Sequence, residues 1–192
     1  MADLISSDLD EDTKNSWRTD PEVFAALNRE FKFSMNAAAN HFNHLVPLYF
    51  TKADNALTID WAIELRHSGD TNGWYNTDAV WVNPPYGRGF IQSFMAKAIE
   101  QKNKGVTTVM LVPATLDAQW LPVNDISEIR IIKGGRLSFY HPITNKKVNG
   151  NTKGSMFVIF RPSNMPCSIR LIDRNELLGT KKKPKSATNA GT

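Results

Sequence analysis

The sequence predicts an α/β fold in which a mostly parallel sheet is flanked by helices. Three short apolar runs, at residues 79–82, 106–112 and 155–160, have the composition of strands that are buried on both faces. Between the first two runs, residues 90–104 place their apolar side chains at helical spacing, and Gly105 follows as a stop. Strand, helix and strand in this order are typical of parallel sheets covered by helices, whose ligands bind beyond the carboxyl ends of the strands.

The other elements are expected on either side of this central unit. A helix starts at Pro21, because Thr19 or Asp20 can cap it and Glu22 suits the positive end of its dipole. Further strands are predicted at residues 33–39, running into a loop of small residues, and at residues 129–132 and 168–172. The remaining segments are predicted as a helix at 57–66, a loop with Gly69 and Gly73 at 67–76 and a mobile loop at 140–153.

Length and composition favour one domain. The chain has 192 residues, of which 41% are hydrophobic and 22% charged, and we expect a single domain at residues 15–178 between a flexible acidic leader at 1–14 and a disordered basic tail at 179–192. No apolar run approaches the roughly 18 residues of a membrane helix, so no membrane partner is expected. Cys167 is the only cysteine, and the spacing of His41 and His44 is a weak metal signal, so no metal is expected either.

The net charge of +4 is unevenly distributed along the chain. Residues 1–14 carry five acidic side chains against one lysine, whereas residues 181–192 carry four lysines and no acid. Residues 129–172, here called the cationic segment, carry eight basic side chains and no acidic one. Such a segment is either a solvated basic face or the binding surface for an anionic partner such as nucleic acid, and we favour the second.

The clearest chemical motif follows the strand at residues 79–82. It is Asn83-Pro84-Pro85-Tyr86, here called the Asn83 loop. The two prolines have no N–H group, so the loop presents its carbonyl oxygens and the Asn83 amide oxygen as acceptors for an amino group. Tyr86 offers a plane on which a base can stack, worth roughly 1–3 kcal/mol. The alternative is a rigid turn with Tyr86 packed on the surface.

The Asn83 loop resembles the catalytic motif of methyltransferases that act on planar amino or amide nitrogens. Further matches occur in the same order over roughly residues 16–161, and together they resemble the small phage-type DNA N6-adenine methyltransferases. They are Trp17-Arg18-Thr19, Asn36-Ala37-Ala38-Ala39, Asp54-Asn55-Ala56-Leu57, Asp60-Trp61, Trp81-Val82, Met110-Leu111-Val112-Pro113-Ala114, Gly135-Arg136-Leu137-Ser138-Phe139 and Gly154-Ser155-Met156.

The resemblance implies a Rossmann-like S-adenosylmethionine-dependent methyltransferase fold. It implies methyl transfer to N6 of a flipped-out adenine in double-stranded DNA, in the cytoplasm of a bacterial host, and leaves the oligomeric state open. The catalytic residues would be Asn83, Pro84, Pro85 and Tyr86. The cofactor would be held by Trp17, Thr19, Asn36, Ala37, Ala38, Asp54, Asn55 and Asn83. The DNA would be contacted by Arg88, Arg130, Lys133, Arg136, Lys146, Lys147 and Lys153.

One departure from the family concerns Asn36, where its members usually have aspartate. No glycine-rich turn is present either, so the alanines at 37–39 would have to allow the close approach of the cofactor, and Asp54 could supply the missing charge. A helix capped by Asn36 is the structural alternative. Two functional alternatives also stay open: a methyltransferase acting on RNA or on a protein glutamine, and a DNA-binding relative without activity.

Overall fold

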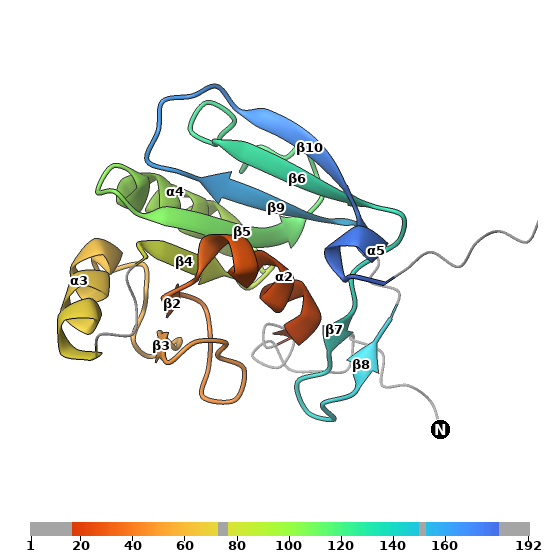
Figure 1. The fold of residues 1–192 in the computed structure, drawn as a ribbon, viewed down its shortest axis with the longest axis horizontal. Helices are drawn as coiled ribbons and strands as arrows, with labels where there is room; N and C mark the ends of the chain where they lie inside the picture. The colour runs from red at the N-terminus through yellow and green to blue at the C-terminus, as the bar shows by residue number, and fades with distance from the viewer. Residues whose placement is uncertain (1–16, 73–76, 150–152, 181–192) are drawn as a thin grey trace, which may run out of the picture.

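A seven-stranded sheet forms the centre of the computed structural model, which describes residues 17–72, 77–149 and 153–180. Its strand order is β10-β6-β9-β5-β4-β2-β3, and only β9 runs antiparallel to its neighbours (Figure 1). The predicted mostly parallel sheet is therefore confirmed. The strands are β2 (Met35–Asn36), β3 (Leu48–Tyr49), β4 (Ala79–Val82), β5 (Thr107–Pro113), β6 (Glu128–Lys133), β9 (Ser155–Phe160) and β10 (Ser168–Asp173).

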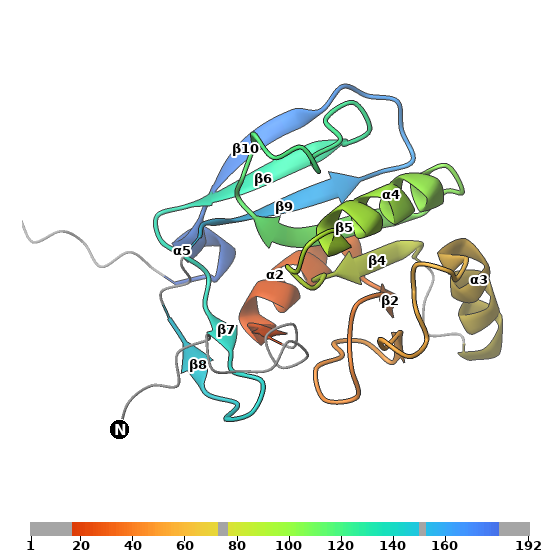
Figure 2. The same cartoon turned by 180° about the vertical axis from the view of Figure 1, so that it is seen from behind.

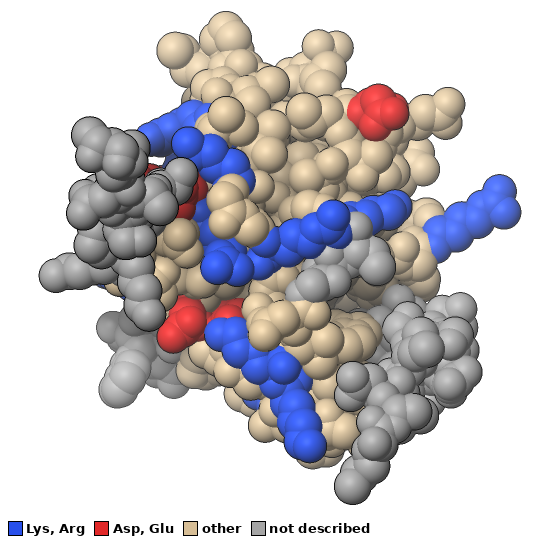
Figure 3. Space-filling view, turned by 90° about the vertical axis from the view of Figure 1, so that its right-hand side faces the viewer, with Lys and Arg blue, Asp and Glu red and all other residues tan. Residues whose placement is uncertain are grey.

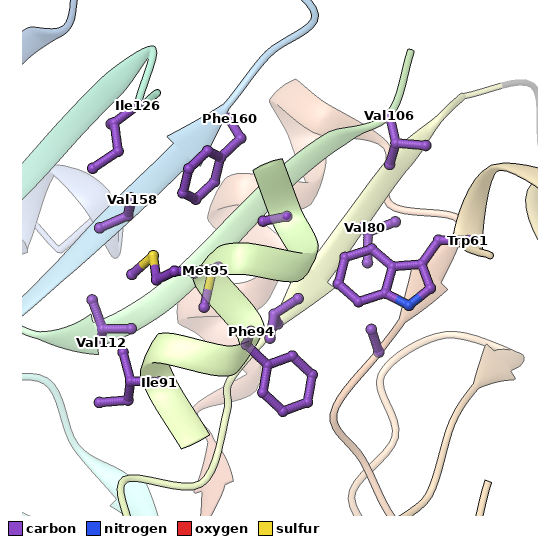
Figure 4. Close-up of a cluster of buried hydrophobic side chains, with 14 of the residues drawn as sticks. Trp61, Val80, Ile91, Phe94, Met95, Val106, Val112, Ile126, Val158 and Phe160 are labelled. Carbon is purple, nitrogen blue, oxygen red and sulfur yellow. The ribbon is translucent and has the colours of Figure 1, made fainter. Parts of the chain in front are cut away.

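Helices cover both faces of the sheet. Helix α2 (Pro21–Phe31) lies on one face, and α3 (Trp61–Asn72) and α4 (Phe90–Lys102) lie on the other, as the two opposite views show (Figures 1 and 2). Side chains of β4 alternate between the two cores: Trp81 packs with the α2 cluster, and Val80 packs with the α4 cluster (Figure 4). Burial on both faces explains why the central strands are continuous apolar runs rather than alternating ones.

A second, three-stranded sheet stands beside the first. It is antiparallel, with the order β1-β7-β8, and consists of β1 (Arg18–Thr19), β7 (Phe139–Tyr140) and β8 (Lys147–Val148). Asp20 caps α2 through the Glu22 N–H and also pairs with Lys147 at 2.6 Å, which ties β8 to the start of the helix. The predicted mobile loop at 140–153 is thus wrong where it forms this hairpin, because β8 pairs with β7 and β7 pairs with β1. Residues 150–152 of that loop lie outside the described part.

Two further expectations need correction. Helix α3 begins at Trp61, where Asp60 accepts the Ala62 N–H at 3.1 Å, and continues to Asn72, so the loop predicted from residue 67 is wrong as far as residue 72. A single glycine, Gly69, costs a helix only about 1 kcal/mol, which did not end it. The helix considered after Asn36 is absent as well, since residues 37–40 leave β2 without helical structure.

The strands predicted at 79–82, 129–132 and 168–172 agree with β4, β6 and β10 to within one residue at each end. The strand predicted at 33–39 is limited to Met35–Asn36, and the helix predicted from residue 57 begins at Trp61. Helix α2 starts at Pro21 with Asp20 as its cap, and α4 ends two residues before the predicted end at residue 104. A short α5 (Arg174–Leu177) follows β10. The predicted leader lies outside the described residues, as does the predicted tail beyond residue 180. Within the described ranges, we find no helix with the length and apolar character needed to cross a membrane.

Candidate active site

A cavity of about 690 Å³ lies beyond the carboxyl ends of β2 and β4. From β2 the chain turns to β3 on one side, and β4 and β5 follow on the other side, so the strand order reverses between β2 and β4. Open parallel sheets bind their ligands at such a switch point. Asn36 and the alanines at 37–39 line the cavity from β2, Asn83 and Pro85 line it from β4, and Trp17 and Thr19 reach it from the second sheet.

Seven of the eight residues predicted to hold the cofactor line this cavity. They are Trp17, Thr19, Asn36, Ala37, Ala38, Asn55 and Asn83. Asp54 is not among the lining residues. Its carboxylate accepts hydrogen bonds from the N–H and the hydroxyl of Thr51 at 2.8 and 2.7 Å, and these bonds lower the pKa of Asp54. Asp54 therefore closes an exposed turn, and only its neighbour Asn55 lies at the cavity.

The side chain of Asn83 is held on both sides. Its Nδ2 donates to the main-chain oxygen of Trp17 at 3.4 Å, and its Oδ1 accepts a hydrogen bond from the Tyr86 hydroxyl at 3.3 Å. An amide oxygen has two lone pairs, so Oδ1 keeps capacity to accept a second hydrogen bond. Pro84 is buried and Pro85 lines the cavity, so the Asn83 loop is fixed in place with an acceptor left over.

Tyr86 anchors the Asn83 loop. Although 42% of the residue surface is exposed, its hydroxyl turns inward, to within 3.3 Å of both Asn83 Oδ1 and the main-chain oxygen of Leu111 in β5. Burial of the hydroxyl raises the pKa of Tyr86 above its usual value, so the group stays protonated and can donate. Tyr86 does not line the cavity itself. Its ring lies at the surface, as expected for a rigid turn, and its hydroxyl bonds Asn83 directly.

Asn36 lines the cavity, and its side-chain amide is bonded within the protein. The residue is only 2% exposed, its Nδ2 donates to the main-chain oxygens of Ala38 and Trp81 at 3.4 Å each, and its Oδ1 accepts the Leu45 N–H at 3.3 Å. These bonds join the end of β2 to β4 and to the following loop. An amide supplies both the donor and the acceptor that this position uses.

The loop between β2 and β3 forms a cavity wall that the sequence analysis missed. Asn40 and Asn43 both line the cavity and bond each other: Asn40 Oδ1 accepts the Asn43 N–H at 2.9 Å, and Asn43 Oδ1 accepts the Asn40 N–H at 2.6 Å. Two asparagines three residues apart, directly after a strand, are a signal for such a loop. Phe50, which precedes the turn closed by Asp54, lines the same wall.

Most of the basic residues predicted to contact DNA gather at the same edge of the sheet as the cavity. Arg88 lines the cavity, Lys133 ends β6, and Lys153 precedes β9, whose first residue pairs with the last residue of β5. Arg136 follows Lys133, and Lys146 and Lys147 lie on the β7–β8 hairpin. Figure 3 shows the face at the side of β7 and β8, where lysine and arginine side chains run across the surface with few acidic ones among them.

Arg130 is the exception, and its predicted role in DNA contact is contradicted by its burial. Only 5% of the residue is exposed, and its guanidinium bonds Glu30 at 2.6 Å and Glu128 at 2.8 Å. Arg161 and Arg170 also reach Glu128, at 2.8 and 3.5 Å. Burial opposes ionisation of Glu128, but hydrogen bonds from Arg130 and Arg161 overcome it and lower the pKa of Glu128 to about 2. Glu30 and Glu128 both lie outside the cationic segment, so the sequence of that segment did not indicate that its arginines are paired with acids.

Comparison with known proteins shows the family of this chain. The model of the family described as DNA N-6-adenine-methyltransferase (Dam) matches residues 6–183. A DNA N-6-adenine-methyltransferase of Escherichia phage T1 is 30% identical over 165 residues, which are 77% of this chain but 63% of the T1 protein, so the chain spans less than two thirds of that relative. A second, of Haemophilus phage HP1 (strain HP1c1), is 30% identical over 166 residues, covering 83% of this chain and 86% of the relative. With the family match extending over almost the whole chain, the protein belongs to the DNA N-6-adenine-methyltransferase (Dam) family.

Proposed function

We propose that the chain transfers a methyl group from S-adenosylmethionine to the N6 amino group of adenine in DNA, with the adenine flipped out of the duplex and held at the Asn83 loop. The family supplies the reaction, since both phage relatives are named as DNA N-6-adenine-methyltransferases. The observation that carries the assignment to this site is the Asn83 amide, which is held from both sides at a cavity and keeps a free acceptor. The sheet with its single antiparallel strand is compatible with a Rossmann-like methyltransferase fold.

The cavity suits the proposed donor in size and chemistry. Its volume is in the range of pockets that bind cofactor-sized ligands, and the small side chains of the alanines at 37–39 line it. Among the described lining residues none is acidic and two, Lys52 and Arg88, are basic, so a sulfonium cation would be stabilised by ring faces and neutral oxygens, while the two basic side chains suit the carboxylate of the donor. Trp17 and Phe50 offer such rings, and Asn55 and Thr19 offer polar atoms. S-adenosylmethionine, when bound there, supplies the activated methyl group.

Asn83 would make the adenine amine a better nucleophile. The lone pair of this amine is delocalised into the ring, and accepting its hydrogens at Asn83 Oδ1 and at the Pro84 carbonyl would favour the localised, tetrahedral form. The same acceptors stabilise the positive charge that develops on N6 during attack, and the proton that N6 then loses passes to solvent. Tyr86 keeps Asn83 oriented from one side, and Trp17 keeps it oriented from the other. Direct displacement needs no covalent enzyme intermediate, so positioning supplies most of the rate.

The basic edge of the sheet would hold the duplex. An adenine within a duplex cannot reach the Asn83 loop, and flipping it out costs a few kcal/mol. Contacts to phosphates offset this cost and fix the register. We assign these contacts to Arg88, Lys133, Arg136, Lys146 and Lys153. Lys147, beside Lys146 on the hairpin, would add a second basic side chain there.

Labelled S-adenosylmethionine, incubated in turn with unmethylated DNA, RNA and protein, tests the proposal. We expect label in DNA alone, recovered as N6-methyladenine after digestion to nucleosides, and no label with an Asn83→Ala variant that still folds. Label in RNA or protein alone would overturn the DNA assignment. Retained DNA binding without label in any substrate would identify an inactive relative.

A further inference from the structure

We propose that His141 is a positioning residue that connects the DNA-facing β7–β8 hairpin to the catalytic amide of Asn83 through Trp17. This inference rests on the proposed function of the Asn83 loop. His141 follows β7, is 6% exposed and does not line the cavity.

The first link lies within the hairpin. His141 Nδ1 is 3.2 Å from the N–H groups of both Ile143 and Thr144, and the His141 carbonyl accepts the Asn145 N–H at 2.9 Å. An unprotonated Nδ1 thus holds the tip of the hairpin, which presents Ile143, 67% exposed, and the neighbouring Lys146. Arg18 of β1 closes the tip from outside by donating to Asn145 Oδ1 at 2.6 Å.

The second link leads from the hairpin to the active site. The His141 ring meets the Trp17 ring edge-on, with 5.1 Å between centroids and 73° between planes. Trp17 lines the cavity, and its main-chain oxygen accepts the hydrogen bond from Asn83 Nδ2. One imidazole therefore touches both the hairpin that would lie against DNA and the residue that orients the catalytic amide. A displacement of the hairpin tip by bound DNA would therefore reach Asn83 through two contacts, from His141 to Trp17 and from Trp17 to Asn83.

The two links can be separated, because they use different parts of the imidazole. His141→Asn keeps a short acceptor for the N–H groups two and three residues ahead but removes the ring from Trp17. His141→Phe keeps a flat ring against Trp17 but removes the acceptor for the hairpin tip. An exposed histidine remote from the site, His67 in α3, provides matched control substitutions to Asn and Phe.

We test this with the full chain by measuring methylation of unmethylated plasmid DNA and, by calorimetry, binding of S-adenosylhomocysteine. His141→Asn should lower kcat about tenfold, the worth of one lost orienting interaction, with the KM for DNA within about twofold of wild type. It should also weaken S-adenosylhomocysteine binding about threefold, because Trp17 is released at the cavity. His141→Phe should instead raise the KM for DNA about fivefold and leave kcat within about twofold.

A merely structural role predicts a different result. In that case both substitutions lower kcat and raise KM together, in step with their loss of thermal stability, and the inference is overturned. Unchanged S-adenosylhomocysteine binding in His141→Asn overturns it too, and this readout needs no turnover. If wild type methylates no DNA although S-adenosylhomocysteine binding still separates the two variants, the proposed function fails while the link through Trp17 stands.

Discussion

Replacing Asn36 by aspartate tests whether the hydrogen bonds of the Asn36 amide stabilise the end of β2 at the cavity. The residue is 2% exposed, and its Nδ2 faces the main-chain oxygens of Ala38 and Trp81 at 3.4 Å each. Asn36→Asp places a carboxylate oxygen where the amide donates, so a buried negative charge would face two carbonyl dipoles. The bond from the Leu45 N–H survives, because the other oxygen still accepts it.

The expected loss in the free energy of unfolding follows from these contacts. Losing two long hydrogen bonds and leaving a buried acceptor unpaired costs about 2–4 kcal/mol. For a chain of this length, that lowers Tm by about 5–15 °C. The carboxyl group introduced by Asn36→Asp would have a raised pKa in the folded state. The part of the destabilisation that comes from the charge is therefore absent below the unfolded pKa of about 3.9, grows as the pH rises from there towards the folded pKa and is complete above it.

Thermal unfolding at pH 7.5 and at pH 5, together with S-adenosylhomocysteine binding, measures the effect. Asn43→Asp is the matched control, because its Oδ1 already accepts an N–H group and its side chain is half-buried; it should shift Tm by less than about 3 °C. If Asn36→Asp has wild-type stability at pH 7.5 and binds S-adenosylhomocysteine more tightly, the bracing role is wrong, and the position serves the cofactor directly as the family's usual aspartate suggests.

The remaining predictions concern the loop, the hairpin and the buried ion pairs. Tyr86→Phe removes the donor to Asn83 and keeps the ring, so kcat should fall about tenfold with cofactor affinity unchanged. Asn83→Ala should lower kcat by at least about a hundredfold. If single-turnover methylation shows equal losses of rate in the two variants, the supporting role of the Tyr86 hydroxyl is contradicted. Lys146→Ala should reduce the slope of DNA affinity against salt concentration by about one. Lys147→Ala should reduce the slope less and mainly lower Tm, because Lys147 pairs with the buried Asp20 carboxylate; an unchanged slope in Lys146→Ala would remove Lys146 from the DNA surface. Because the pKa of Glu128 is held at about 2, its contribution to stability is present at neutral pH and disappears as the pH falls from about 4.5 through 2. The stability of Glu128→Gln should therefore depend less on pH over this range, as measured by acid unfolding. An unchanged dependence would refute the stabilising role of the ionised Glu128 carboxylate.

Local signals were sufficient where each residue's environment depends on its near neighbours. Pro21 after Asp20 marked the start of α2, and the apolar runs marked β4, β5 and β9, because strands buried on both faces have to be apolar throughout. The hairpin of β7 and β8 was missed because its strands are two residues long and are stabilised by β1, more than a hundred residues earlier. No local pattern encodes such a pairing.

The site shows the same division. The Asn83 loop was recognisable because two adjacent prolines after a buried strand leave few conformations and only acceptors. The contacts that orient Asn83, from Trp17 and from Tyr86, were not recognisable, since one of them joins residues 66 positions apart. Asp54 was expected at the cavity but does not line it, and one of its carboxylate oxygens bonds its own turn.

The sequence by itself determined the central succession of β4, α4 and β5, the acceptor-rich loop after β4 and the excess of positive charge in the cationic segment. Only the tertiary structure decided which of those charges are available to DNA. Glu30 from α2 and Glu128 at the start of β6 neutralise Arg130, Arg161 and Arg170, and Asp20 pairs with Lys147. Lys133, Arg136, Lys146 and Lys153 gather at the edge of the sheet that holds the cavity. The physical reason is that charges interact through space over a few ångströms, and the fold brings these partners together from distant parts of the chain.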